Sequence, residues 1–526
     1  MSQAQTATFL PASLGFIDRA IAVFENRRAL VVAGFSAFFL LVCALVSATK
    51  LMWYDEMTTY YPARLPVRGI LSFFGQALDV HTPTASLVLH ATMKALGDSP
   101  VTDRLPFMLG FLVMLLAIYR FVARRAPVEY AIAAMIFPAV SGVFYYATEI
   151  RCYGLELGLT GIALLCWQDA GFENAGGRRR AIAIPGLFLS LAGAMCCHYF
   201  AVFLLIPFAL GELVRTWRRK RVDAPVWLAL ILSPSVLLLF VPAIRAARGM
   251  YTPDGFARPG LGHISNAYLT MLTPAFVPIF VAAVFYFLLA PKFSRRAPAL
   301  VRPPIEERVL ATTLALTPVI GALSAYVLGA YVYRYTLYAI AGISIFLAFE
   351  MCRGLKGDRM AAVVLSIALA GWFAAKSATT VHAAMVENGG IRTPLAEPYR
   401  NSAWMKALEG SSLPVMATPA VFFLQLQEYA PAEVRPRVLY AGDHALALKI
   451  EHSDTGETNL FSFRTMLPLR VEEFNDFVRA NPHFLLAAET TYATGWHIPA
   501  LIERGAQLRL LNRTDTYFVF DVTMEK

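Results

Sequence analysis

The chain has 526 residues, of which 57% are hydrophobic and 16% are charged, and its mean hydropathy is +0.54. A soluble globular domain carries about 25% charged residues, so a soluble fold would leave large apolar areas in contact with water. The formal net charge of +10 does not indicate nucleic-acid binding, because the basic residues form short clusters between apolar runs. The composition therefore favours a membrane protein.

Several apolar runs are long enough to cross a bilayer, which takes about 20 residues. The first, Ala29 to Ala48, is longer than the apolar region of a signal peptide, so an uncleaved anchor is expected. Further runs lie near 105–122, 128–147, 153–167, 182–196, 199–214, 225–244, 264–290, 309–330, 336–351 and 360–378. The sequence predicts a polytopic α-helical membrane protein with about 11 transmembrane helices.

The basic clusters indicate the orientation. If Arg27 and Arg28 are cytoplasmic, an odd number of spans places every dense basic cluster on that side, namely 124–125, 178–180, 218–221, 292–308 and 353–359. The opposite side receives the long first loop and the tail. We therefore expect a bacterial inner-membrane protein built from a cytoplasmic N-terminus (1–28), a transmembrane module (29–379) with its outer loop (50–103), and an extracytoplasmic domain (380–526).

The tail alternates strand-like and helix-like segments. These lie at 415–418, 420–429, 438–441, 471–480, 484–488, 498–504 and, as a final pair of strands, within 508–522. The order predicts a small α/β domain with a parallel core and a closing hairpin. No glycine-rich phosphate loop follows a strand, so no nucleotide is expected there.

The first outer loop gathers ionisable residues immediately after the first span. Asp55 and Glu56 open the loop, His81 and His90 follow, and the stretch 70–78 is predicted to form an amphipathic helix on the membrane surface. Adjacent carboxylates at a membrane edge are commonly solvated charges. A loop of this length with its own helices is, however, more often functional than connective.

Two short outer turns and one helix end add basic and aromatic groups. Arg151 and Tyr153 lie between the third and fourth spans, and Tyr333 and Arg334 lie between the ninth and tenth. His198 lies at the outer end of the fifth and sixth spans. A lone arginine at such a place commonly reaches lipid headgroups, and a lone histidine there is commonly a packed residue.

The arrangement suits a polyprenyl phosphate, which needs cations at the membrane edge above an apolar groove. Arg104, Arg151 and Arg334 are expected at the same depth as Asp55. Because a phosphate is already a good leaving group, sugar transfer from such a lipid requires a base and charge stabilisation but no strong acid. Asp55 is the candidate base, and Glu56 would orient the acceptor or help Asp55 hold a divalent cation.

Short motifs resemble those of the GT-C fold glycosyltransferases, in the bacterial branch near protein O-mannosyltransferases and lipid A aminoarabinose transferases. They are Asp55-Glu56, His81-Thr82-Pro83, Asp103-Arg104-Leu105-Pro106 and Glu149-Ile150-Arg151-Cys152-Tyr153, with Cys197-His198-Tyr199-Phe200 and Tyr333-Arg334-Tyr335 in family-like places. Their order and spacing relative to the spans carry the resemblance over residues 20–380. Thr82 departs from the family's usual proline pair.

The resemblance implies a GT-C fold with Asp55 as the catalytic base. It places the donor phosphate at Arg104, Arg151 and Arg334, and it makes His81, Tyr153, His198 and Tyr333 candidates for the substrate site. The activity expected is inverting transfer of a hexosyl or pentosyl group from a polyprenyl-phosphate donor to an extracytoplasmic glycan, lipid or protein. Family members differ in metal dependence, so a divalent cation stays open.

Two alternatives belong to other functional classes. A transporter or flippase of lipid-linked sugars would carry charged residues inside its spans, whereas Glu156 and Glu212 are both expected near helix ends as interfacial residues. A membrane-anchored envelope assembly protein would act through its tail and would leave Asp55 without a role.

If the protein is the enzyme, the partner of Arg151 would be a ligand phosphate. Arg151→Ala is therefore expected to weaken use of the donor rather than folding.

Overall fold

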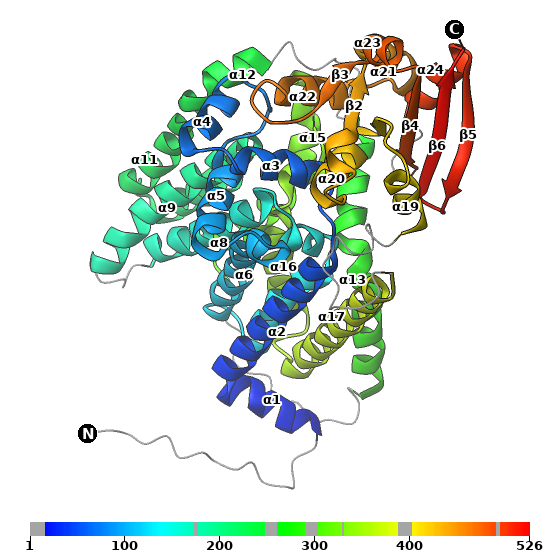
Figure 1. Cartoon of the computed structure of the whole chain (residues 1–526). Helices are drawn as coiled ribbons and strands as arrows, with labels where there is room; N and C mark the ends of the chain where they lie inside the picture. Colours follow the sequence, from blue (N-terminus) through cyan, green and yellow to red (C-terminus); the bar gives the residue numbers. More distant parts are fainter. Residues whose placement is uncertain are drawn as a thin grey trace.

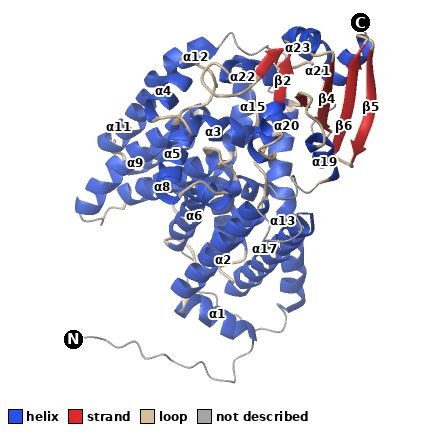
Figure 2. Cartoon of the chain, in the orientation of Figure 1, coloured by secondary structure: helices blue, strands red, loops and turns tan. Residues whose placement is uncertain are grey.

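The computed structural model describes residues 16–172, 177–247, 260–289, 303–328, 331–387, 402–490 and 495–525. Long helices form most of the molecule, and a mixed sheet with its own short helices caps one end (Figures 1 and 2). Within these residues, seven segments are long and apolar enough to cross a membrane, or nine if each of two bent helix pairs is one span. The chain is a multi-pass membrane protein with a C-terminal α/β domain.

The unbroken segments are α2 (Arg28–Thr49), α6 (Pro100–Ala123), α9 (Gly177–Cys197), η2 with α10 (Tyr199–Leu204, Leu205–Arg219), α11, η3 and α12 (Ala224–Leu232, Ser233–Phe240, Val241–Ala247), α13 (Gly262–Leu289) and α17 (Arg359–Glu387). The bent pairs are α7 (Val128–Val140) with η1 (Gly142–Thr148), at 72°, and α14 (Ile305–Ala315) with α15 (Thr317–Leu328), at 52°. Helices α8 (Tyr153–Ala170) and α16 (Ala339–Gly354) occupy two further expected spans but have only 18 and 16 residues. The predicted number of 11 transmembrane helices is reached only if α8 and α16 also cross the membrane.

Glycines allow α6 and α8 to pack closely. A Cβ at Gly158 of α8 would lie 2.6 Å from the carbonyl oxygen of Gly110 on α6, and a Cβ at Gly154 would collide with the carbonyl oxygen of Phe107. Small residues spaced four apart let two helix backbones approach in this way. The contact fixes the start of α8, and with it the turn that carries Arg151, against the start of α6.

Ion pairs join the basic loops to one another. Arg124 pairs with Asp169, Arg125 with Glu307, Arg180 with Asp223, and Arg218 with Glu306, at 2.5 to 2.9 Å. These loops therefore share one end of the helical bundle, as the distribution of charge predicts. Residues 292–302 of the expected cluster at 292–308 lie outside the described residues.

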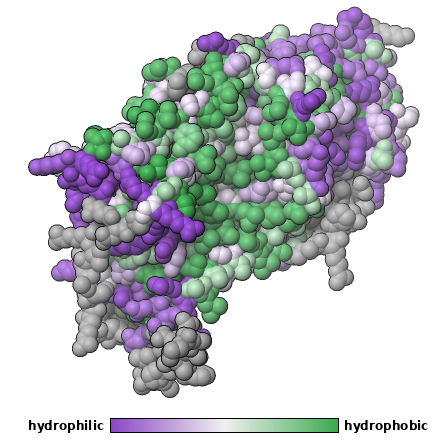
Figure 3. All heavy atoms as spheres, turned by 90° about the vertical axis from the view of Figure 1, so that its left-hand side faces the viewer, coloured by the Kyte–Doolittle hydropathy of each residue, from purple (hydrophilic) through white to green (hydrophobic). Residues whose placement is uncertain are grey.

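Apolar side chains cover the middle of the molecular surface. Figure 3 shows hydrophobic residues between a hydrophilic region over the C-terminal domain, at the upper right, and another at the lower left. Large apolar residues such as Leu239, Phe280 and Phe287 are more than two-thirds exposed on α10 to α13 and their connections. Such a surface is stable only in contact with lipid.

The two acids in apolar runs, Glu156 and Glu212, are buried by neighbouring helices. Glu212 accepts hydrogen bonds from Arg215 Nη1 at 2.8 Å and from Trp167 Nε1 at 3.0 Å, so its charge is compensated inside the bundle. Glu156, in the first turn of α8, is 1% exposed. The apolar runs predict how deep a residue lies along a helix, but not which neighbouring helix covers it.

The first outer loop folds into α3 (Tyr54–Ala63), α4 (Val67–Gly75) and α5 (Thr84–Leu96). Helix α4 falls close to the amphipathic stretch expected at 70–78, with Ile70, Phe73 and Phe74 buried. The N-terminal helix α1 (Phe16–Asn26) lies at the far end of the molecule from the sheet (Figure 1). The outer loop thus supplies a layer of short helices under the C-terminal domain.

The C-terminal domain contains six strands in the order β3-β2-β1-β4-β6-β5. They are β1 (Val415–Thr418), β2 (Val438–Gly442), β3 (Val471–Glu473), β4 (His483–Glu489), β5 (Ala506–Arg513) and β6 (Tyr517–Met524). The helices are α19 (Ala403–Glu409), α20 (Ala420–Tyr429), α21 (His444–Glu451), α22 (Thr455–Phe463), α23 (Phe474–Ala480) and α24 (His497–Glu503), with the short turn η6 (Arg435–Arg437). Another short turn, η5 (Tyr333–Thr336), belongs to the membrane module and lies between α15 and α16. Strands β3, β2, β1 and β4 are parallel, and β6 and β5 close the sheet as an antiparallel hairpin, as the sequence predicts.

Helix α20 joins the C-terminal domain to the outer loop. Gln425 Nε2 donates a hydrogen bond to the carbonyl oxygen of Met52 at 2.8 Å, and the amide of Met52 donates to the Tyr429 hydroxyl at 3.2 Å. The Tyr61 hydroxyl donates to the carbonyl oxygen of Leu424 at 3.1 Å. One hydrophobic cluster runs without a break from the bundle into this domain. The domain is therefore fixed on the outer loop.

Candidate active site

A cavity of about 370 Å³ lies between the C-terminal domain and the end of the bundle that carries α3 and η5. We call the wall from the membrane module the floor; it includes Asp55, Asp79, His81, Arg334 and Tyr335. We call the wall from the C-terminal domain the roof; it includes Thr418, Tyr440, Glu451, Glu457, Asn459 and His497. The cavity is at the opposite end of the bundle from the basic loops.

Asp55 and Arg334 meet on the floor. Arg334 Nη2, in η5, lies 3.3 Å from Asp55 Oδ2, in the first turn of α3, and both side chains are partly open to the cavity. Burial by itself would lower the pKa of Arg334, but the neighbouring Tyr153 and Asp55 raise it above its usual value. The floor therefore holds a carboxylate and a permanent cation in direct contact.

Arg151 lies behind the floor and is nearly saturated by the protein. Its Nη1 donates to the Asp55 carbonyl oxygen at 3.0 Å and to the Thr58 and Thr59 hydroxyls at 3.2 Å each. Its Nη2 donates to His81 Nε2 at 2.6 Å. Since these bonds connect three segments of the chain, removal of Arg151 would disturb α3 itself. The expectation that Arg151→Ala spares folding is therefore not supported by these contacts.

His81 connects Arg151 to a carboxylate that we did not expect. Because His81 Nε2 accepts from Arg151, its Nδ1 must donate, and it does so to Asp79 Oδ1 at 2.5 Å. Burial opposes the charge of Asp79, but His81 and Arg151 outweigh this and hold its pKa below the usual value. The Asp-x-His spacing in the sequence is the signal that could have revealed this pair.

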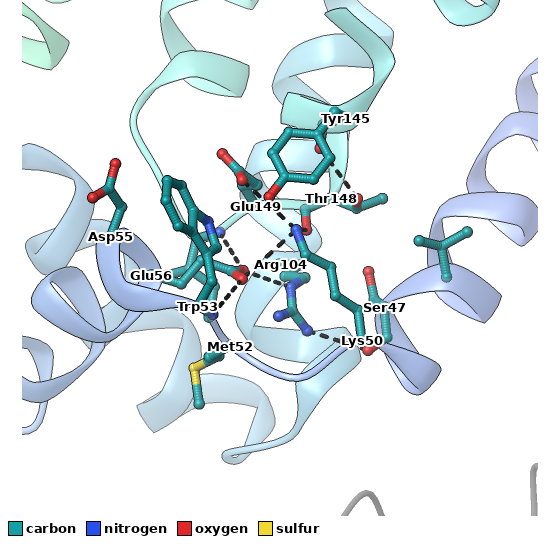
Figure 4. A network of polar contacts seen from close by, with 12 residues as sticks. Ser47, Lys50, Met52, Trp53, Asp55, Glu56, Arg104, Tyr145, Thr148 and Glu149 are labelled. Carbon is teal, nitrogen blue, oxygen red and sulfur yellow. Dashed lines mark hydrogen bonds and ion pairs between the residues drawn. The ribbon is translucent and has the colours of Figure 1, made fainter. Parts of the chain in front are cut away.

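Glu56 points away from Asp55 into a separate buried network (Figure 4). Its Oε1 accepts hydrogen bonds from Arg104 Nε at 2.8 Å and from the Ile150 amide at 3.0 Å. Burial would raise the pKa of Glu56, but Arg104 and Lys50 outweigh it and keep the carboxylate charged. Neither Glu56 nor Arg104 lines the cavity, in contrast to the roles expected for them.

The network ends at a second carboxylate. Lys50 Nζ lies 3.7 Å from both Glu56 Oε2 and Glu149 Oε1. Burial raises the pKa of Glu149 to about 7, although Lys50 opposes the shift. The network holds the first turn of α3 against the turn at 149–151, and so keeps Asp55 and Arg151 side by side.

The remaining candidates pack around the floor without lining the cavity. The His198 ring lies 4.7 Å from that of Tyr335 and 5.8 Å from that of Tyr153, and its Nδ1 accepts from the Phe200 amide at 3.3 Å. Burial, with His81, Arg151 and Arg334 nearby, lowers the pKa of His198 well below its usual value, so its ring is neutral. The Tyr333 hydroxyl accepts from that of Tyr146 at 3.1 Å.

Asp55 and Glu56, the two candidate metal ligands, do not form a metal site together. Within the described ranges, no group of three His, Cys, Asp or Glu side chains is placed to hold a metal ion. Asp55 faces Arg334 while Glu56 faces Arg104, so these two carboxylates do not share a cation. We therefore derive no chemical step from a metal.

No sequence pattern revealed the roof. Asn459 Nδ2 donates to the Tyr54 hydroxyl at 2.9 Å, although the two residues are 405 positions apart. A contact between residues so far apart in the sequence cannot be predicted from the spacing of nearby residues. Thr418 and Tyr440 lie in predicted strands, whereas Glu451, Glu457 and Asn459 lie in α21 and α22, between the expected segments 438–441 and 471–480.

Comparison with known proteins shows the fold. No family model and no curated protein matches the chain. ArnT from Cupriavidus metallidurans bound to undecaprenyl phosphate is similar in structure, with a TM-score of 0.57 and 11% identity over 93% of this chain and 97% of that chain. Apo ArnT gives a TM-score of 0.47 with 13% identity, over 93% of this chain and 98% of that chain. The similarity to the lipid-bound ArnT shows that the chain has a GT-C fold, as its motifs predict.

Proposed function

We propose that this protein is a glycosyltransferase that moves a sugar from a polyprenyl phosphate to an acceptor hydroxyl, on the extracytoplasmic side of a bacterial inner membrane. The main support is the contact of 3.3 Å between Asp55 and Arg334 inside the cavity. A base and a cation at this separation are what displacement of a phosphate by a hydroxyl requires. ArnT, which shares the fold, has been crystallised with undecaprenyl phosphate.

The chemistry is a single in-line displacement. The acceptor oxygen attacks the anomeric carbon, the bond from this carbon to the phosphate oxygen breaks, and the acceptor proton passes to the Asp55 carboxylate. Arg334 stabilises the charge that builds on the departing phosphate. Arg151 contributes by holding the Asp55 backbone and the His81 ring, because its hydrogen bonds go to those groups.

The shape of the molecule suits a lipid donor. The cavity lies between the helical bundle and the C-terminal domain, where the phosphate of a membrane lipid would be held. The polyprenyl chain would lie along the apolar surface of the helices (Figure 3). The basic loops at the other end favour a cytoplasmic position for that end. The sugar would be a hexose or a pentose, and the acceptor a glycan, a lipid or a protein.

The test uses the purified full-length protein and a polyprenyl-phosphate sugar. Released polyprenyl phosphate is measured for the wild type, for Asp55→Asn and for Arg334→Ala. We expect Asp55→Asn to lower turnover by about 10²-fold or more, the usual contribution of a general base, with an unchanged unfolding temperature. Arg334→Ala should weaken binding of the lipid phosphate as well as turnover.

Asp476→Asn is the matched control, since this carboxylate is exposed on the C-terminal domain and does not line the cavity. Its turnover should equal that of the wild type. Full turnover by Asp55→Asn would exclude Asp55 as the base. Such a result, together with partner binding by the tail, would favour the assembly-protein alternative.

A further inference from the structure

The roof is built at a characteristic place in an α/β sheet. Strands β1, β2 and β3 follow one another toward one edge, and β4 then pairs on the other side of β1. In open α/β sheets, ligands bind beyond the carboxyl ends of the strands where the order reverses in this way. Thr418, the last residue of β1, lies at this position and lines the cavity. The roof therefore has the location of a ligand site in its own right.

The polar groups of the roof are acceptors and hydroxyls rather than cations. Glu457 is 3% exposed, and its Oε1 accepts from the Tyr440 hydroxyl at 2.6 Å and from Trp496 Nε1 at 2.8 Å. Glu451 Oε1 accepts from the Trp496 amide at 2.8 Å. Two carboxylates are thus held in place by neutral donors and keep acceptor capacity for a ligand.

The histidine of the roof adds no positive charge. His497 Nε2 donates to the Ala441 carbonyl oxygen at 2.7 Å, and Nδ1 accepts from the Thr418 hydroxyl at 2.8 Å. Burial lowers the pKa of His497 to about 4, in agreement with a neutral ring. Among the described residues that line the cavity, the permanently charged cation is Arg334, on the floor. An anionic group would consequently bind at the floor and be repelled by the roof.

The roof is also close to the reacting centre. Asn459 donates to the hydroxyl of Tyr54, the residue directly before Asp55. Since floor and roof line one cavity, a sugar linked to a phosphate on the floor would lie beside the roof. The rings of Trp53, Tyr54 and Tyr440 line the same space and offer apolar faces for the C–H groups of a sugar.

We propose that the roof binds the uncharged, hydroxyl-rich sugar ring of the donor, with Glu457 and Thr418 as direct partners of its hydroxyls. This inference rests on the proposed function, and it assigns sugar recognition to the C-terminal domain and phosphate recognition to the membrane module. A sugar hydroxyl of the acceptor has the same chemistry. The donor is favoured because its ring is bonded to the phosphate that the floor would hold.

The experiment separates the two halves of the donor. Affinities of the full-length protein in nanodiscs are measured for undecaprenyl phosphate alone and for undecaprenyl phosphate carrying a hexose or a pentose. Glu457→Gln should weaken binding of the sugar-bearing lipid by about tenfold, the value of one hydrogen bond to a charged group. Its affinity for undecaprenyl phosphate alone should stay within about twofold of the wild type.

Thr418→Val removes a hydroxyl without changing the shape of the side chain, and it should produce a smaller loss of the same kind, about threefold. Glu503→Gln is the matched control, because that carboxylate is exposed and pairs with Lys449 outside the cavity lining. Unfolding temperatures of all variants show that the compared proteins are folded.

Other outcomes would overturn the assignment. If Glu457→Gln and Thr418→Val weaken both lipids equally or neither, the roof does not recognise the sugar. If they raise only the KM for the acceptor, the roof binds the acceptor instead. In all these cases the proposed function survives as long as Arg334→Ala still weakens both lipids. Unchanged binding of both lipids by Arg334→Ala would reject the proposed function itself.

Discussion

Asp55 and Glu56 follow each other on α3, and the helix turns them about 100° apart. Asp55 meets Arg334 in the cavity, whereas Glu56 is buried against Arg104. A pair of acids in a sequence suggests a shared task, but a helix gives adjacent residues different surroundings. Asp55 is thus open to a ligand, whereas Glu56 holds α3 against the backbone of Ile150.

Glu149 makes the network behind the cavity sensitive to pH. Burial raises its pKa from 4.5 to about 7, so between these values the folded protein binds a proton that the unfolded chain releases. The contribution to stability is complete below pH 4.5 and is lost as the pH rises through 7; it amounts to at most about 3 kcal/mol. The unfolding temperature of the wild type should fall over this range more steeply than that of Glu149→Gln. If the unfolding temperatures of the two proteins fell equally with pH, the raised pKa of Glu149 would be contradicted.

At the scale of elements, the packing of α6 on α8 sets the position of the turn that carries Arg151. The carbonyl oxygen of Gly110 and the backbone of Gly158 are so close that no larger residue fits. This contact links a feature of the lipid-embedded region to the geometry of the site. The sequence predicts each helix, but not that these glycines face one another.

Gly158→Ala should destabilise the protein by about 1–3 kcal/mol, because its Cβ would lie 2.6 Å from the Gly110 carbonyl oxygen. The unfolding temperature measures the effect, and turnover should fall with it as Arg151 shifts. Gly34→Ala on α2 is the matched control, since nothing lies within 4 Å of its Cβ. Equal stability of the two variants would mean that α6 and α8 are not in close contact.

Several helices and strands could be predicted because their apolar residues recur with a helical or strand period. Strand β1 and helix α20 begin and end at the residues expected, because alternating and periodic apolar residues report local structure. The bends after Val140 and Ala315 are less visible, since an apolar run continues through each. The contact of Asp55 with Arg334 agrees with the prediction that both lie at one membrane depth.

At the scale of the whole molecule, the floor is built from residues 55–81 and 334–335, and the roof from residues 418–497. Tyr54 and Asn459 meet across 405 positions, and nothing in either local sequence encodes that meeting. The distribution of basic residues predicts which end of a membrane span a residue occupies. This is sufficient to predict that the residues of the floor lie at the same end of the bundle. The position of the roof depends on how the C-terminal domain docks, and the contacts that hold it there, such as those of Tyr61 with Leu424 and of Asn459 with Tyr54, are not visible in the sequence.

The orientation can be tested with single cysteines. Arg479 is exposed on the C-terminal domain, and Lys220 is exposed after α10 among the basic loops. In intact cells, a maleimide that cannot cross the inner membrane should label Arg479→Cys, whereas Lys220→Cys should be labelled only after lysis. The wild type gives the background from the natural cysteines. The reverse pattern would place the cavity in the cytoplasm.

Helix α20 binds both the carbonyl and the amide of Met52, only a few residues before Asp55. Exchange of the tail by itself would therefore remove both of these hydrogen bonds to Met52. A chimera designed to accept another sugar would have to import α3 and the segment before it along with the new tail.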